Sequence, residues 1–171
     1  MASKLNAARR ASRIRFLILD VDGVMTDGGL YYSADGVELK RFNAQDGYGI
    51  VRARECGVGI GIISGRETPI VEARARALGI DDVYQGAADK VEAMREIQVR
   101  YHLRDEEIAY IGDDVFDLPL LSVVGFSAAP KNARPEVRRK VDLVTSVAGG
   151  EGAVRELIDF ILTYRPRHGS R

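Results

Sequence analysis

Short apolar runs alternate with amphipathic segments along the chain, and the apolar runs predict buried strands. Largely apolar stretches occupy residues 14–19, 58–64 and 108–112, with Arg15 near the start of the first and Ser64 at the end of the second. Runs of this kind are typical of strands that are buried on both faces of a sheet. A shorter run near Val83-Tyr84 and the segments VGFSA and DLVT predict further strands at residues 124–128 and 142–145.

The segments between these runs carry helix signals. Asp89 precedes one helical pattern as a capping residue, Thr68-Pro69 opens another, and Gly57 and Gly79 provide stops. We expect helices over residues 46–55, from Thr68-Pro69 to Gly79, from Lys90 to about Tyr101, up to Leu121, and over 153–163. Strands that alternate with helices predict an α/β fold with a doubly wound parallel sheet.

One segment departs from this alternation. The runs LYY and VELKRF are separated by residues 33–36, with the sequence Ser-Ala-Asp-Gly, which is typical of a β-hairpin. The length of 171 residues suits one domain, and we expect residues 1–171 to form it, with loose tails at about 1–12 and 165–171.

Composition narrows the class of partner. Lys plus Arg and Asp plus Glu both number 25, so no bulk charge favours nucleic acid or an anionic membrane. No apolar run approaches the ~18 residues of a membrane span. Cys56 is the only cysteine, which excludes a disulfide within the chain. We therefore expect a cytoplasmic protein, although the basic start weakly resembles a transit peptide.

Acidic residues follow two of the predicted strands. Asp20 and Asp22 form an Asp-x-Asp-Gly motif after the first strand, and Gly112-Asp113-Asp114 follows another. In parallel sheets ligands bind beyond the carboxyl ends of the strands. Several carboxylates around one point indicate a hard cation, which we take to be Mg²⁺, with Asp114 and Asp117 supporting its ligands from outside. A plain Asp-Gly turn and an acidic helix start are the alternatives.

Two further residues fit a phosphate site. Ser64, in Ile63-Ser64-Gly65-Arg66, supplies a hydroxyl at a strand end. Lys90 stands at a helix start, where a cation opposes the helix dipole and a nearby phosphate would explain it. An ordinary loop and a solvated lysine are the alternatives when each residue is considered alone.

Together the motifs resemble those of the haloacid dehalogenase-like phosphatases, over roughly residues 14–163. The resemblance implies that Asp20 attacks phosphorus and that Asp22 transfers protons. It implies that Ser64 and Lys90 hold the phosphoryl group. Asp20, Asp113 and the Asp22 backbone carbonyl would bind Mg²⁺. Members often carry a cap domain, for which this chain has no room.

The segment from Asp20 to Ile50 and the stretch GGEGAVREL are similar to one branch of that superfamily, whose members hydrolyse 3-deoxy-D-manno-octulosonate 8-phosphate in lipopolysaccharide synthesis. This likeness implies substrate contacts from Asp22, Lys90, Arg66 and Arg74. It implies further contacts from Asn43, Ala44, Gln45, Asp46 and Gly47. Arginine suits a sugar acid because its fork binds a carboxylate with two hydrogen bonds. Members often have arginine where this chain has Val51.

Three alternatives stay open at this point: a sister phosphatase acting on nonulosonate 9-phosphates, a receiver-like phosphorylation switch domain, and an inactive binding protein. The family resemblance also implies a homotetramer. Its hairpins would close a shared sheet, and one subunit would cover the active site of another. The alternative is a hairpin that folds onto its own subunit.

Overall fold

The computed structural model describes residues 2–166, and its centre is a sheet of six strands. The strand order is β5-β4-β1-β6-β7-β8, and all five pairings are parallel. The predicted doubly wound parallel sheet is therefore confirmed. The strands are β1 (Phe16–Leu19), β4 (Gly59–Ile63), β5 (Asp82–Tyr84), β6 (Ile108–Ile111), β7 (Phe126–Ala129) and β8 (Leu143–Val144).

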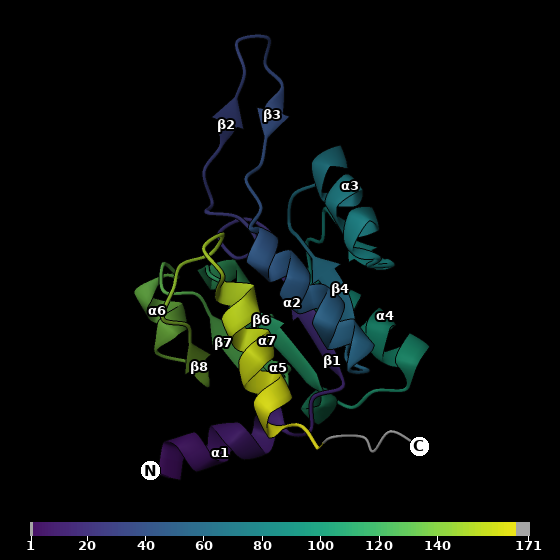
Figure 1. The fold of residues 1–171 in the computed structure, drawn as a ribbon, viewed down its shortest axis with the longest axis vertical. Coiled ribbons are helices and arrows are strands. Elements are labelled where there is room, and N and C mark those ends of the chain that lie inside the picture. The colour runs from purple at the N-terminus through teal and green to yellow at the C-terminus, as the bar shows by residue number, and fades with distance from the viewer. Residues whose placement is uncertain (1, 167–171) are drawn as a thin grey trace.

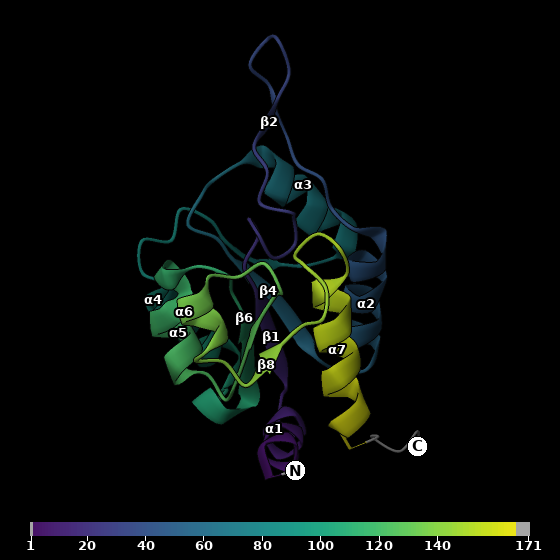
Figure 2. The same cartoon turned by 90° about the vertical axis from the view of Figure 1, so that its left-hand side faces the viewer.

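Helices cover both faces of the sheet, as Figure 2 shows with the sheet seen nearly edge-on. One layer contains α1 (Ala2–Ala11), α2 (Ala44–Glu55), α3 (Pro69–Leu78) and α7 (Ala153–Tyr164). The other contains α4 (Lys90–Tyr101), α5 (Leu118–Val123) and α6 (Pro135–Arg138). Alternate residues of β1 serve the two layers: Leu17 and Leu19 pack on the first, and Phe16 and Ile18 on the second.

A β-hairpin projects beyond the sheet, as Figure 1 shows. Strand β2 (Tyr31–Tyr32) pairs antiparallel with β3 (Glu38–Leu39). The turn is closed by a hydrogen bond from the Gly36 N–H to the Ser33 carbonyl, 2.9 Å, with Gly36 at φ 80°. The hairpin predicted around residues 33–36 is thus present. Its large apolar side chains are exposed: Leu30, Tyr31, Tyr32, Val37 and Leu39.

Residues 2–11 form helix α1 where we expected a loose segment. Alanine-rich sequence has high helix propensity. The helix is also attached to the sheet layer, since Ala11 is buried and the Arg10 guanidinium pairs with Asp142. Of the second expected tail, only residues 165 and 166 lie in the described part, where Arg165 donates to the carbonyls of Cys56 and Gly57.

Two short 3₁₀ turns complete the elements, at Asp105–Glu107 and Val115–Asp117. Within residues 2–166, no helix is both long and apolar enough to cross a membrane.

Candidate active site

The polar residues that follow the strands meet at the carboxyl edge of the sheet. Asp20 follows β1, Ser64 follows β4, and Asp113 lies just beyond β6, while β1 lies between β4 and β6. They border an open pocket of about 300 Å³, and Asp22 in its lining contacts Lys40 at the base of the hairpin. Its lining comprises Asp20, Asp22, Gly23, Gly28, Ser64, Gly65, Arg66, Lys90, Asp113, Asp114, Phe116 and Asp117.

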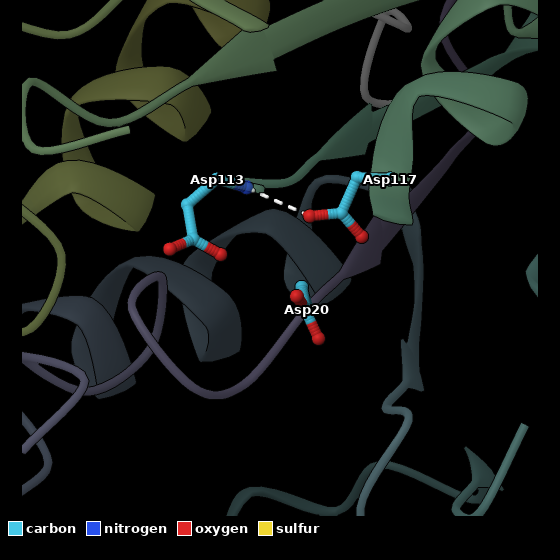
Figure 3. A group of neighbouring side chains, drawn as sticks. All are labelled: Asp20, Asp113 and Asp117. Atoms are coloured by element: carbon cyan, nitrogen blue, oxygen red, sulfur yellow. Dashed lines mark hydrogen bonds between the residues drawn. The ribbon is translucent and has the colours of Figure 1, made fainter. Parts of the chain in front are cut away.

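Three carboxylates gather in this pocket (Figure 3). Asp20, Asp113 and Asp117 each place an oxygen within 4.8 Å of the others. Gly23 makes this approach feasible, because a Cβ at its position would collide with the Asp113 carboxylate, and its φ of 83° also favours glycine. The sequence-predicted juxtaposition of Asp20 with Asp113 is present in the structure.

Asp117 supports the cluster instead of offering a free ligand. Its Oδ2 accepts the N–H groups of Asp113 and Asp114, at 2.9 and 3.1 Å. Its Oδ1 accepts from Lys90 Nζ and from the Tyr110 hydroxyl, both at 2.6 Å. Both oxygens are therefore engaged, and the residue fixes the loop that carries Asp113.

Lys90 reaches the cluster from the first turn of α4. The Asp89 side chain caps this helix by accepting the Val91 N–H at 2.8 Å. The Lys90 ammonium lies 3.0 Å from Asp20 Oδ1, and the side chain is almost completely buried. Burial alone would lower the pKa of Lys90, but Asp20 and Asp117 outweigh it and raise that pKa. The lysine therefore stays charged beside the predicted nucleophile.

One lysine does not neutralise the acidic cluster. Burial, followed by repulsion from Asp117, raises the pKa of Asp20 to about 7. Burial, followed by repulsion from Asp20 and Asp117, raises the pKa of Asp113 to about 7. Both residues offer carboxylate oxygens, which are the ligands that Mg²⁺ prefers. A divalent cation would supply the charge that this group lacks, so the residues fit the expected metal.

Asp22 lines the pocket but lies outside the acidic cluster. Its carboxylate contacts the Lys40 ammonium at the base of the hairpin, and its Oδ2 lies 3.8 Å from Arg66 Nη1. Ser64 is buried, and its Oγ accepts the Arg66 N–H at 3.3 Å. The structure thus brings together Asp22, Ser64, Arg66 and Lys90, as the sequence predicted.

Residues 43–47 and Arg74 do not line this pocket. They form a separate group at the start of α2, where Asn43 caps the helix by accepting the Gln45 N–H at 2.7 Å and Ala44 is the first helical residue. Arg74 donates to the Asn43 carbonyl at 3.3 Å and packs against Gly47.

The Asp46 carboxylate has a structural partner of its own. It is buried and accepts the Arg155 N–H, 2.7 Å away, at the start of α7. Burial raises the pKa of Asp46 to about 6, because it outweighs the hydrogen bonds from the backbone N–H groups at the start of α7, which lower that pKa. In the described chain this side chain joins α2 to α7, and only 3% of the residue is exposed to meet a ligand.

Three residues of the site were not predicted. Tyr110 lies within the apolar run of β6, where only its hydroxyl distinguishes it from a core residue, yet it contacts Lys90 Nζ at 3.0 Å. Phe116 is half exposed at the pocket rim, and the centroid of its ring lies 5.4 Å from Lys90 Nζ. Lys40 had no sequence signal beyond its place in the hairpin.

An Asp-x-Asp motif after the first strand, a serine and a lysine at neighbouring edges, and a Gly-Asp-Asp loop define a haloacid dehalogenase-like hydrolase. A family model described as haloacid dehalogenase-like hydrolase matches residues 77–157. Among curated proteins, the chain is 46% identical over 154 residues to 3-deoxy-D-manno-octulosonate 8-phosphate phosphatase KdsC of Yersinia pestis, covering 90% of this chain and 82% of that protein. The chain therefore belongs to the 3-deoxy-D-manno-octulosonate 8-phosphate phosphatase family, within the haloacid dehalogenase-like superfamily.

Solved structures agree with this assignment. The Yersinia pestis phosphatase superimposes with a TM-score of 0.92 at 44% identity, covering 94% of this chain and 86% of that one. The Moraxella catarrhalis phosphatase, solved in complex with magnesium, phosphate and KDO, gives 0.90 at 35% identity, covering 93% and 91%. The resemblance inferred from the motifs is confirmed, and the receiver-domain alternative is excluded.

Proposed function

We propose that the chain hydrolyses 3-deoxy-D-manno-octulosonate 8-phosphate to the free sugar acid and phosphate, as a step of lipopolysaccharide synthesis. The observation that carries this proposal is the Lys90 ammonium 3.0 Å from Asp20 Oδ1, beside two further carboxylates at the mouth of a parallel sheet. The relatives named for this activity cover nearly the whole chain, which supports the substrate.

In this mechanism an Asp20 carboxylate oxygen attacks phosphorus, and the bond from phosphorus to the sugar oxygen breaks. The leaving oxygen keeps the electron pair and takes a proton from Asp22, which lines the same pocket. Asp22 then accepts a proton from water as that water attacks phosphorus. The bond from phosphorus to Asp20 breaks, and inorganic phosphate leaves.

The remaining residues would reduce the electrostatic repulsion between the phosphoryl group and the Asp20 carboxylate. Lys90 and Ser64 would hold phosphoryl oxygens against Asp20. Mg²⁺, held by Asp20, Asp113 and the Asp22 carbonyl, would offset the negative charge that otherwise repels an anionic nucleophile. Asp117 would keep Lys90 charged and in place through its 2.6 Å contact.

We propose that Arg66, which lines the pocket, binds the carboxylate or the phosphate of the sugar acid. Arg74 and residues 43–47 lie outside this pocket. We therefore propose that Arg74, Asn43, Ala44 and Gln45 meet substrate across a subunit boundary in a homotetramer, whereas the buried Asp46 and Gly47 hold the start of α2 in place. The exposed apolar hairpin supports that assembly, since a lone two-stranded hairpin is marginal in water and has unpaired edges.

Residues 1–171 would then act as one catalytic domain whose missing cap is supplied by a neighbouring subunit. Within the described residues, only the hairpin separates Asp22 from α2. We place the enzyme in the cytoplasm, where a chain with one cysteine needs no disulfide framework.

The proposed substrate is tested by comparing the turnover of 3-deoxy-D-manno-octulosonate 8-phosphate with that of a nonulosonate 9-phosphate. Both assays contain Mg²⁺, and Asp20→Asn serves as the inactive control. We expect kcat/KM to favour the octulosonate by at least about tenfold, because a mispositioned anion forfeits at least about 1.4 kcal/mol of binding. A preference for the nonulosonate would assign the chain to the sister activity instead.

A further inference from the structure

Lys40 is a buried cation at the base of an exposed hairpin. Its side chain is 1% exposed, and its ammonium contacts the Asp22 carboxylate and lies 3.3 Å from Glu38 Oε1. A charged ammonium is costly to remove from water unless carboxylates pair with it. The two carboxylates therefore account for the burial of Lys40.

The cation next to Lys40 in the sequence is not buried. Arg41, the next residue, is 53% exposed and pairs with Glu151 at 2.7 Å on the outer surface. The chain thus directs one of two adjacent cations toward the active site and the other toward solvent. Arg41 provides a matched control for the charge of the hairpin base.

The contact with Lys40 bears directly on Asp22. The Asp22 carboxylate lies on a loop beyond β1 and has no partner in the acidic cluster. Lys40 holds one of its oxygens, and Arg66 approaches the other at 3.8 Å. A group that transfers a proton must lie within hydrogen-bond reach of the leaving oxygen. A misplacement of about 1 Å can cost roughly a hundredfold in rate.

Glu38 extends this link into the hairpin strand. Its Oε1 lies between the two cations, 3.3 Å from Lys40 Nζ and 3.1 Å from Arg66 Nη2. Neither contact to this oxygen is an aligned hydrogen bond, so they are ion pairs. The hairpin, Arg66 and Asp22 are thereby connected through one group of charges.

We propose that Lys40 is a positioning residue, which fixes the Asp22 carboxylate for proton transfer and ties the hairpin to the active site. The proposal rests on the proposed function in one respect, since it takes Asp22 as the proton donor to the leaving oxygen. Lys40 contacts neither the acidic cluster nor the Lys90 ammonium in the described structure, so its loss leaves the phosphoryl-binding group intact.

The experiment compares two leaving groups in the full-length enzyme with Mg²⁺. Sugar phosphates release a poor leaving group that needs protonation, whereas para-nitrophenyl phosphate does not. We expect Lys40→Met to lower kcat for the sugar phosphate by about 10- to 100-fold and for para-nitrophenyl phosphate by less than about threefold. Asp22→Asn serves as the reference for the full leaving-group effect.

Two further variants separate positioning from general damage. Lys40→Arg keeps a cation that can pair with Asp22, and it should restore most of the selective loss. Arg41→Met should leave both substrates within about twofold of the wild type, because it removes only the ion pairs of an exposed side chain, with Glu151 and Asp27. If Lys40→Met does not fold, Lys40→Gln replaces it, with the same selective loss expected.

An equal loss of kcat for both substrates, or no loss for either, would overturn the role of Lys40. A wild-type enzyme that hydrolyses other alkyl phosphates but not the octulosonate 8-phosphate would contradict the proposed substrate alone. The comparison would then use the alkyl phosphate that is hydrolysed, so the two proposals fail by different results.

Discussion

Replacing Asp20 by asparagine should abolish turnover and also stabilise the metal-free protein at alkaline pH. In the folded chain, burial and then Asp117 raise the pKa of Asp20 from its ordinary value of 3.8 to about 7. Asparagine has nearly the same shape and carries no charge. Lys90 keeps Asp117 as a partner, 2.6 Å away, so the substitution strands no cation.

The size of the effect follows from proton linkage. Below about pH 4 the carboxyl is protonated in both states and imposes no penalty. As pH rises from about 4 to about 7, the unfolded state ionises first, so the folded state loses stability through that window. A change of one in pKa is worth about 1.4 kcal/mol, which gives a penalty of at most about 4 kcal/mol above pH 7.

Urea unfolding with EDTA present, followed by circular dichroism, measures this difference. At about pH 8 we expect Asp20→Asn to raise the free energy of unfolding by about 2–4 kcal/mol, and at about pH 5 by less than half as much. Asp81→Asn changes an exposed carboxylate near β5 and should stay within about 0.5 kcal/mol at either pH. An Asp20→Asn protein that is no more stable than wild type at pH 8 would refute this account of the cluster.

Three other results are expected. Lys90→Met should reduce kcat at least about a hundredfold. It should also destabilise the fold by about 3 kcal/mol, because Asp20 and Asp117 lose their shared cation. Lys90→Arg, assayed in parallel, keeps the positive charge but changes the shape of the side chain, so it separates the two contributions. Exhaustive EDTA treatment should remove activity, and Mg²⁺ should restore it while Ca²⁺ does so poorly, because its larger shell is looser; full activity in EDTA would contradict the metal requirement. Deleting residues 33–36 should abolish assembly and sugar-phosphate turnover while sparing para-nitrophenyl phosphate, and sedimentation of a fully active wild-type monomer would exclude the tetramer.

The sheet could be predicted because its strands are buried on both faces. The run at 16–19 has no polar interruption, and Leu17 and Ile18 pack into opposite helical layers. Such a pattern leaves few alternatives to a parallel sheet. The helix starts were less accurate: α2 begins at Ala44 and not near residue 46, because the Asn43 side chain supplies the cap.

Other elements depend on contacts that are distant in sequence. Helix α1 is held through Arg10 and Asp142, and neither residue indicates the other. Helix α6 has only four residues, too few for a periodic pattern.

In the site, too, residues with a local sequence signal could be predicted, and residues that depend on distant contacts could not. Asp20, Ser64 and Asp113 could be located because each follows an apolar run, and parallel strands end at one edge. Tyr110 and Lys40 could not, because their roles depend on the tertiary positions of Asp117 and Asp22. The assignment of Asp46 to substrate was made by likeness to a family, whereas the structure directs its carboxylate to the start of α7.

The account rests on a phosphoryl group transferred to Asp20, and trapping that group tests it most directly. The enzyme is mixed with substrate and Mg²⁺, quenched in acid during turnover, and reduced with borohydride, which converts an aspartyl phosphate to homoserine. Mass spectrometry of the peptide that contains residues 16–22 then locates the change. We predict conversion at Asp20 in wild type and none in Asp20→Asn. Conversion at another residue, or an unmodified Asp20 during rapid turnover, would contradict the mechanism.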